Sequence, residues 1–207
     1  MKLNKFEKMS ADYIGLDNLK RIQSVTVGIA GAGGLGSNCA AHLVRCGFRK
    51  LRIIDFDVVE YSNLNRQFYF ADQIGKRKID ALTENLRRIN PALEIKTCAE
   101  KISARNIIEL FADCDIVAEA FDRAEDKSML VSELIPTGKF VVSVSGLAGY
   151  ADTDLIQVHR ISENLVLIGD LESSVGAARP PLSPRVAVAA AKQANVILRY
   201  VIEKWNI

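Results

Sequence analysis

From residue 25 onward, strand-like segments alternate with segments whose apolar residues have helical spacing. The predicted strands are five or six residues long and cover 25–30, 51–55, 94–98, 116–121 and 140–144. The predicted helices between them cover 35–46, 78–89, 106–111 and 125–135, and the one over 78–89 is stopped by Asn90-Pro91. This alternation predicts a Rossmann-like α/β fold with a doubly wound, mostly parallel sheet.

The pattern changes after Gly146. Segments 154–159 and 165–168, joined by a polar turn, predict an antiparallel pair. A stretch rich in Ser, Gly, Ala and Pro over 171–184 predicts a loop that crosses the surface. The chain then ends in an amphipathic helix predicted over 186–205. Its apolar face fits either a homodimer contact or packing onto its own sheet, and consists of Val188, Ala191, Val196, Leu198 and Val201.

Length and composition indicate one domain over 1–207, with an N-terminal arm over 1–24. The chain has 207 residues, 49% of them hydrophobic, which is enough for a core without a disulfide or metal. Its 27 Lys and Arg nearly balance 25 Asp and Glu, so charge suggests neither a nucleic-acid surface nor a membrane surface. No signal-peptide-like or membrane-spanning segment is evident, and we expect a cytoplasmic protein.

Four scattered cysteines argue against a zinc site and a disulfide framework, because no C-x-x-C pair occurs among them. The strongest chemical signal is a glycine turn directly after the first predicted strand, with Gly31, Gly33, Gly34 and Gly36. Such a turn directs the N-terminus of a helix at phosphate. It serves nicotinamide and flavin dinucleotides equally well.

Polar residues after later strands indicate which kind of reaction the glycine turn serves. Asp55 and Asp57 follow the second strand, and Asp122 follows the fourth. The intervening segment supplies Asn63, Arg66, Gln67 and Lys78. Residues that follow strand ends in a parallel sheet can converge on one crevice. Hydride transfer has no need of the two cations, whereas attack on a phosphate does, so the pattern predicts an enzyme that uses ATP.

The motifs together resemble the ThiF/MoeB family, relatives of the ubiquitin-activating enzymes. The resemblance runs from Val25 to the C-terminal helix. It rests on 28–36, 55–60, 62–67, Ile74-Gly75 with Lys78, 88–91, Phe121-Asp122, 184–186 and 193–195. It implies an adenylyltransferase that uses ATP to activate the C-terminal glycine carboxylate of a small ubiquitin-fold sulfur carrier, similar to ThiS, and releases pyrophosphate. A homodimer and a role in thiamine or related sulfur metabolism are also implied.

The resemblance assigns roles to the site residues. Arg66 and Lys78 would neutralise phosphate charge, and Asp55 would accept hydrogen bonds from the ribose hydroxyls. Asn63 and Gln67 would orient phosphate or Arg66. Asp122 would bind magnesium through oxygen and, with Arg66 and Lys78, form the catalytic set. The nucleotide site as a whole consists of Gly31, Gly33, Gly34, Gly36, Asp55, Asp57, Asn63, Arg66, Gln67 and Lys78.

Several features depart from the family pattern. The paired cysteines that hold a structural zinc in many relatives are missing, and the loop over 171–184 has no cysteine for sulfur transfer. The N-terminal arm lacks an Arg-Gln pair, Arg123 stands where Asn is common, and Lys127 stands where Arg is frequent.

Other hypotheses remain open. An NAD-binding oxidoreductase or redox sensor would need only the glycine turn. A non-catalytic nucleotide-binding scaffold would need the site without turnover. An enzyme acting on a non-protein carboxylate, such as the threonylcarbamoyl group of a tRNA, is disfavoured by the near-neutral charge. Each residue also has a structural interpretation: Asp55 and Asp57 would end a strand, residues 76–78 would be a solvated helix turn, and Arg66 would be a surface arginine.

Overall fold

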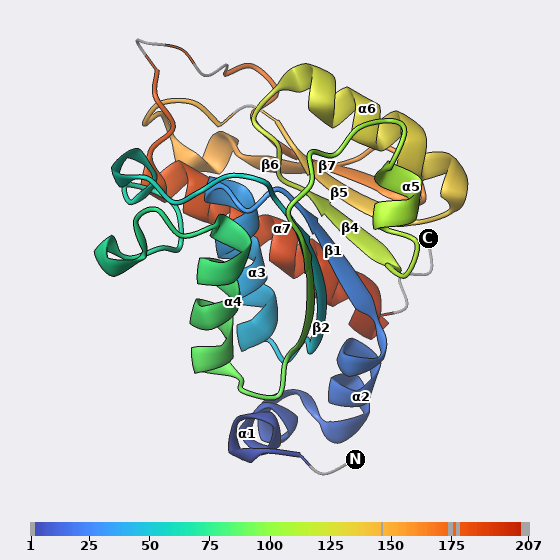
Figure 1. The fold of residues 1–207 in the computed structure, drawn as a ribbon. Coiled ribbons are helices and arrows are strands. Elements are labelled where there is room, and N and C mark those ends of the chain that lie inside the picture. The colour runs from blue at the N-terminus through green and yellow to red at the C-terminus, as the bar shows by residue number, and fades with distance from the viewer. Residues whose placement is uncertain (1–2, 146, 174–175, 177–178, 204–207) are drawn as a thin grey trace.

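A computed structural model describes residues 3–145, 147–173, 176, 179 and 180–203. Seven strands form one sheet in the order β3-β2-β1-β4-β5-β7-β6 (Figure 1). All neighbouring strands are parallel except β6 and β7, so the predicted doubly wound sheet with an antiparallel extension is confirmed. The strands are β1 (Thr26–Ala30), β2 (Lys50–Ile54), β3 (Glu94–Cys98), β4 (Ile116–Glu119), β5 (Phe140–Val144), β6 (Gln157–Arg160) and β7 (Leu165–Gly169).

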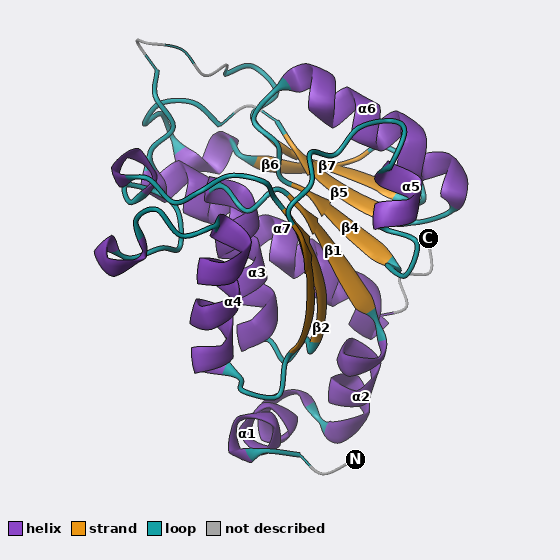
Figure 2. Ribbon diagram, in the orientation of Figure 1, coloured by secondary structure: helices purple, strands orange, loops and turns teal. Residues whose placement is uncertain are grey.

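Helices cover both faces of the sheet (Figure 2). One face packs against α2, α3, α4 and α7, and the other against α5 and α6. The helices are α1 (Lys5–Ile14), α2 (Leu16–Ser24), α3 (Gly34–Arg45), α4 (Lys78–Ile89), α5 (Ile107–Leu110), α6 (Ala124–Leu134) and α7 (Ser183–Glu203). Short 3-10 turns occur at Tyr61–Asn63, Ala71–Gln73, Ile135–Thr137 and Thr153–Leu155.

The strand order reverses between β1 and β4, because β2 lies on one side of β1 and β4 on the other. Ligands of open α/β sheets bind outside the carboxyl ends of the strands at such a point. The glycine turn after β1 and the turn after β4 therefore face the same crevice.

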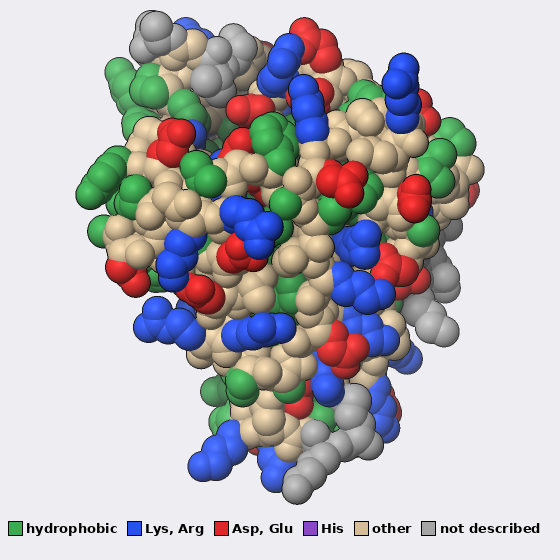
Figure 3. Space-filling model, in the orientation of Figure 1, with side chains coloured by type: hydrophobic (Ala, Val, Ile, Leu, Met, Phe, Trp, Pro, Cys, Tyr) green, Lys and Arg blue, Asp and Glu red, His purple; other side chains and the backbone are tan. Residues whose placement is uncertain are grey.

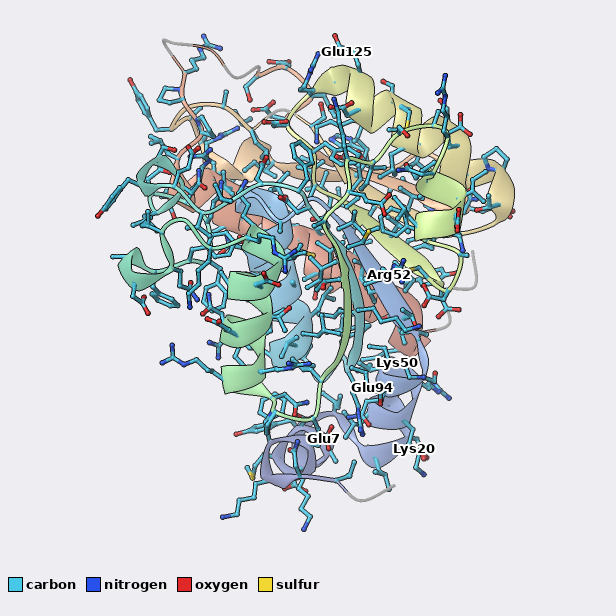
Figure 4. All side chains as sticks on the ribbon, in the orientation of Figure 1. Glu7, Lys20, Lys50, Arg52, Glu94 and Glu125 are labelled. Carbon is cyan, nitrogen blue, oxygen red and sulfur yellow. The ribbon has the colours of Figure 1, made fainter. Side chains whose placement is uncertain are left out.

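The N-terminal arm is helical rather than extended. Asn4 begins α1 with a reciprocal pair of hydrogen bonds, in which its side chain accepts from the Glu7 N–H and the Glu7 carboxylate accepts from the Asn4 N–H. Glu7 is buried and forms an ion pair with Arg49, whose guanidinium also pairs with Glu94 at 3.1 Å. Figure 4 labels Glu7 and Glu94 at this end of the molecule, away from the carboxyl ends of the strands.

The C-terminal helix packs onto its own sheet and onto α3. Of its predicted apolar face, Val196 and Val201 are buried, Val188 and Leu198 are partly buried, and Ala191 is exposed and does not take part in the packing onto the sheet. The helix also begins at Ser183, inside the loop predicted over 171–184, and residues 204–205 of the predicted helix lie outside the described residues.

No helix in the described part of the chain is long and apolar enough to cross a membrane. On the face drawn in Figure 3, Lys and Arg side chains are interspersed with Asp and Glu, as the near-equal charge counts predict.

Candidate functional site

The glycine turn joins β1 to α3 through backbone geometry that side chains would block. Gly31 has a φ of 97°, which favours glycine. A Cβ atom on Gly36 would lie 1.8 Å from the Gly31 carbonyl oxygen, so the turn and the helix approach too closely for any other residue. Gly33 precedes the first residue of α3, where N–H groups without helical partners are available to an anion.

Asp55 braces this turn from the end of β2. One carboxylate oxygen, Oδ2, accepts from the Ala32 N–H at 2.6 Å, and Oδ1 accepts from the Asp57 N–H at 2.8 Å. Burial raises the pKa of Asp55, although these hydrogen bonds and the charge of Lys78 oppose the shift. Asp55 therefore has a structural role at the end of β2. Each of its carboxylate oxygens still has a lone pair with which to accept from a ligand.

Lys78 is buried, with 7% of its surface exposed, and its ammonium lies 2.8 Å from Asp57 Oδ2. The interpretation of residues 76–78 as a solvated turn is wrong for Lys78 and right for its neighbours. Lys76 and Arg77 are exposed and pair with Glu84 and Asp80. Lys78 is thus the one of these three cations whose charge faces inward.

Tyr69 ties Lys78 to the glycine turn. Its hydroxyl lies 2.7 Å from the Ala32 carbonyl oxygen, to which it can donate, and 3.4 Å from the Lys78 carbonyl oxygen. Burial, together with the nearby Asp55 and Asp57 carboxylates, raises the pKa of Tyr69, so its hydroxyl keeps its proton. Sequence reasoning missed Tyr69, although it follows closely after the Asn63–Gln67 motif.

Arg66 lies against the N-terminus of α3. Its side-chain carbons Cγ and Cδ would be 3.5 and 3.6 Å from a Cβ on Gly34. The amide of Asn38, on α3, donates to the Arg66 carbonyl at 2.8 Å and fixes the segment there. The guanidinium donates to the Ser62 carbonyl and to Asn65 Oδ1 in exposed hydrogen bonds, so its orientation is fixed by its own segment while its carbons pack beside Gly34.

The side chain of Gln67 lies over the glycine turn, whereas the side-chain amide of Asn63 bonds within its own turn. Gln67 is buried, its Nε2 would be 4.0 Å from a Cβ on Gly33, and its Oε1 has no hydrogen-bond partner among the described residues. A buried polar atom without a partner costs stability and suggests a missing one. Asn63 instead holds its own turn, accepting from the Glu60 N–H and donating to Ser62.

Asp122 lies on the turn after β4. Its side chain is exposed and makes no hydrogen bond or ion pair with any residue that the structure describes. The turn contacts the glycine turn, since the Ala120 N–H donates to the Ala30 carbonyl and the Phe121 ring would be 3.6 Å from a Cβ on Gly31. Within the described ranges, no cluster of three or more His, Cys, Asp or Glu side chains is arranged to hold a metal.

Sequence reasoning also missed a buried polar set behind these turns. Glu119 interrupts the apolar run of β4, which was a visible signal, and it binds Lys127 and Ser143. Gln193 on α7 donates to the carbonyls of Glu119 and Val142 and so joins β4 to β5. Gln193 belongs to a motif that carries the family resemblance, but its role could not be read from the sequence, because its partners are distant in the chain.

Comparisons with known proteins show which family the chain and its fold resemble. The ThiF family model matches residues 7–204. The chain is 35% identical over 153 residues to the adenylyltransferase and sulfurtransferase UBA4 of Eremothecium gossypii, covering 71% of this chain and 34% of that protein. It is 40% identical over 104 residues to the ubiquitin-like modifier-activating enzyme 5 of Arabidopsis thaliana, covering 50% of this chain and 24% of that protein. The matched part of the chain thus spans about a third of the length of the first relative and about a quarter of the second.

Among solved structures, the fold matches the E. coli tRNA N6-threonylcarbamoyladenosine dehydratase, TcdA, in complex with ATP. The TM-score is 0.89 at 20% identity, covering 97% of this chain and 95% of that chain. E. coli MccB with ATP matches with a TM-score of 0.75 at 19% identity, covering 97% of this chain and 64% of that one. The glycine turn, the cations beside it and the family model over nearly the whole chain lead to one conclusion: this chain belongs to the ThiF family.

Proposed function

We propose that this protein uses ATP to adenylate the C-terminal glycine carboxylate of a small ubiquitin-fold carrier protein. The observation that carries the proposal is a pair of cations beside the glycine turn. The carbons of Arg66 pack against Gly34, and the Lys78 ammonium pairs with Asp57, whose N–H donates to the Asp55 carboxylate that braces the turn. A dinucleotide site for hydride transfer would need the turn without these cations. The triphosphate of ATP carries the charge that they would neutralise.

The reaction joins two anions. A carboxylate oxygen of the carrier attacks the α-phosphorus, the bond from that phosphorus to the bridging oxygen breaks, and pyrophosphate leaves with the electron pair. The N-terminus of α3 would hold the phosphates, with Arg66 as a fork of donors above Gly34. In the structure the Lys78 ammonium donates to Asp57 Oδ2 at 2.8 Å. When ATP binds, the ammonium would exchange this contact for one with a phosphate oxygen. Gln67 Oε1 and Asp55 are acceptors for ligand donors such as the ribose hydroxyls.

The residues also fit a magnesium ion. Magnesium in nucleotide sites is held by one or two carboxylates together with phosphate oxygens, so a cluster of protein ligands is not required. Asp122 offers an exposed carboxylate that no described side chain occupies. A bound magnesium would supply charge neutralisation and orientation of the phosphates.

The relatives support this function in part. One is named an adenylyltransferase and sulfurtransferase, another a ubiquitin-like modifier-activating enzyme, and one structural match holds ATP. A ThiS-like carrier, a homodimer and a cytoplasmic location belong to the proposal, as does the absence of structural zinc.

The test is carrier-dependent exchange of pyrophosphate into ATP. Arg66→Ala should slow exchange by on the order of a hundredfold or more while weakening ATP binding much less, because charge develops at the phosphates in the transition state. Arg87→Ala is the matched control, since Arg87 is exposed and lies in the last turn of α4, at the opposite end of that helix from Lys78. Deleting the final glycine of the carrier should abolish exchange. The non-catalytic scaffold would be favoured if the protein binds ATP but catalyses no pyrophosphate exchange with any of the carrier proteins ending in Gly-Gly that are encoded near its gene.

A second substrate class has a specific observation in its favour. The match to the tRNA N6-threonylcarbamoyladenosine dehydratase covers nearly the whole of both chains, whereas UBA4 is matched over a third of its length. A carboxylate on a modified tRNA would meet the same phosphate chemistry. Exchange that depends on tRNA carrying the threonylcarbamoyl group, and not on any carrier, would decide for it.

A further inference from the structure

The carboxyl end of β4 contains a fully buried carboxylate. Glu119 is 0% exposed, and its two oxygens lie 3.0 and 3.1 Å from the ammonium of Lys127 on α6. The Ser143 hydroxyl on β5 donates to it at 2.5 Å, and the Phe121 N–H donates at 2.7 Å. One side chain therefore joins β4, β5, α6 and the turn between β4 and α6.

Packing alone does not explain this choice of residues. Burying an ion pair costs desolvation, and apolar side chains of similar volume often stabilise a core as well or better. What the pair adds is direction, because charge-assisted hydrogen bonds hold donor and acceptor in one geometry. The apolar neighbours Val117 and Val141, on the same face of the sheet, show that hydrophobic residues are used where only packing is needed.

The pair restrains the turn that carries Asp122. Glu119 holds the N–H of Phe121, immediately before Asp122, and Lys127 holds the first turns of α6 immediately after it. Figure 4 labels Glu125 at this start of α6. The base of the turn is fixed from behind as well, by Gln193 on the Glu119 carbonyl. Asp122, which has no partner of its own among the described residues, is thus carried by a segment anchored on both sides.

We infer that Glu119 and Lys127 are a positioning pair that fixes the Asp122 carboxylate at the rim of the glycine turn, where it receives the magnesium of bound ATP. The inference rests on the proposed function. Lys127 is not assigned a phosphate contact, since both Glu119 oxygens hold its ammonium and only 20% of its side chain is exposed. The pair acts through Asp122 and touches neither substrate.

The experiment measures how much magnesium is needed for ATP to stabilise the protein, by thermal unfolding across a magnesium titration. Lys127→Met should raise the magnesium concentration at half-maximal stabilisation about tenfold, with the effect of ATP at saturating magnesium nearly unchanged. Lys127→Arg should restore the native midpoint, because a guanidinium can bind both oxygens of Glu119. Lys101→Met, on an exposed lysine, is the matched control.

Asp122→Asn separates positioning from general damage. If Lys127 acts only through Asp122, the double variant should need no more magnesium than Asp122→Asn alone. Lys127→Met leaves the Glu119 charge buried without a partner. If that variant does not fold, the double variant Glu119→Gln with Lys127→Met, which buries no charge, takes its place. A midpoint equal to the native one, or effects of Lys127→Met and Asp122→Asn that multiply, would overturn the inference.

A direct readout keeps the inference apart from the proposed function. Amide hydrogen exchange at residues 121–123 should be faster in Lys127→Met than in the native protein, with β1 and β2 unchanged. Absence of ATP stabilisation at any magnesium concentration would defeat the proposed function. Unchanged exchange at 121–123 would defeat the positioning pair alone.

Discussion

Gly36 shows at the scale of one residue why the glycine turn has its sequence. Three glycines of the turn meet different limits. Gly31 needs its positive φ, Gly36 has the Gly31 carbonyl against it, and Gly33 has nothing nearer than the Gln67 amide at 4.0 Å. The first two glycines serve the fold, and Gly33 leaves space that a ligand can use.

Substitution separates these two roles. Gly36→Ala should destabilise the protein by about 3 kcal/mol, at the upper end of overpacking costs, because the new methyl group meets backbone that cannot move aside. Gly33→Ala should leave the unfolding free energy within about 1 kcal/mol and weaken ATP binding instead. Urea denaturation and ATP titration of the two variants make the comparison. A Gly33→Ala protein as unstable as Gly36→Ala would contradict it.

Single residues also mark how far the sequence could predict the site. Motif spacing places the glycines, Asp55, Arg66, Gln67, Lys78 and Asp122 after strand ends, and in the structure they lie on the glycine turn or on segments that contact it, while their roles remain predictions. Asn63 was assigned to the ligand but holds its own turn, which spacing does not reveal. Glu119 was missed because a buried ion pair depends on Lys127 and Ser143, whose proximity only the folded chain provides.

At the scale of elements, the loop before α7 is held by one buried network. Arg185 on α7 is 1% exposed and donates to Asp170 at 2.5 Å and to the carbonyls of Ala151 and Asp152. Asp170 also accepts from Ser173. The residue after it, Leu171, holds a φ of 60°, which costs a non-glycine residue about 1 kcal/mol or more. The network keeps both ends of the loop in place despite this strain.

Asp170→Asn should destabilise the protein by about 3 kcal/mol at neutral pH, because it leaves the Arg185 charge buried without its partner. Burial raises the pKa of Asp170, but hydrogen bonds from Ser173 and Glu172 and the charge of Arg185 outweigh it, so the pKa lies below its ordinary 3.8. The stabilisation is therefore complete above pH 3.8 and is lost as the pH falls through the lower folded pKa.

The difference in unfolding free energy between Asp170→Asn and the native protein should consequently shrink between pH 6 and pH 3. Urea denaturation at both values measures it, with Asp72→Asn on an exposed aspartate as the control. A difference that stays constant with pH would show that the carboxylate charge is not what stabilises this loop.

Most elements were predictable from periodicity. Helix α4 and strands β3 and β5 begin and end as predicted, and the other helices and strands from β1 onward differ by a few residues at one or both ends, apart from the short 3-10 turns, which were not predicted. The helical form of the N-terminal arm was not predicted, although Asn4 and Glu7 have the spacing of a capping box, because α1 and α2 are short and polar. Arg185 was known only as part of a family motif, and its network joins residues far apart in the chain.

At the scale of the whole molecule, the strand order makes the site possible. The reversal between β1 and β4 opens the carboxyl edge of the sheet, and helices on both faces bury the rest. The same architecture serves dinucleotides, so ligand preference separates the hypotheses that the fold leaves equal.

ATP with magnesium should therefore raise the melting temperature more than NAD does. At an ATP concentration of a hundred times Kd, binding raises the free energy of unfolding by about 2.7 kcal/mol, which corresponds to a rise in melting temperature of roughly 5–10 °C for a protein of this size. Arg66→Ala should lessen the effect of ATP only slightly. Equal or greater stabilisation by NAD in differential scanning fluorimetry would favour the oxidoreductase.

Metal content gives a separate test of the family branch. With no C-x-x-C pair in the sequence, the purified protein should contain far less than one zinc per chain, and chelators should leave its melting temperature unchanged. Elemental analysis by mass spectrometry measures the first and thermal unfolding the second. Stoichiometric zinc would require ligands other than paired cysteines.

The position of α7 has a consequence for biosynthesis. This helix supplies Val186, whose methyl group would be 3.0 Å from a Cβ on Gly34, and Gln193, which joins β4 to β5. Ribosomes make chains from the N-terminus, so the glycine turn leaves the exit tunnel long before the helix that packs against it. A nascent chain therefore cannot complete the packing around its glycine turn, or the link between β4 and β5, until residues up to Gln193 have emerged.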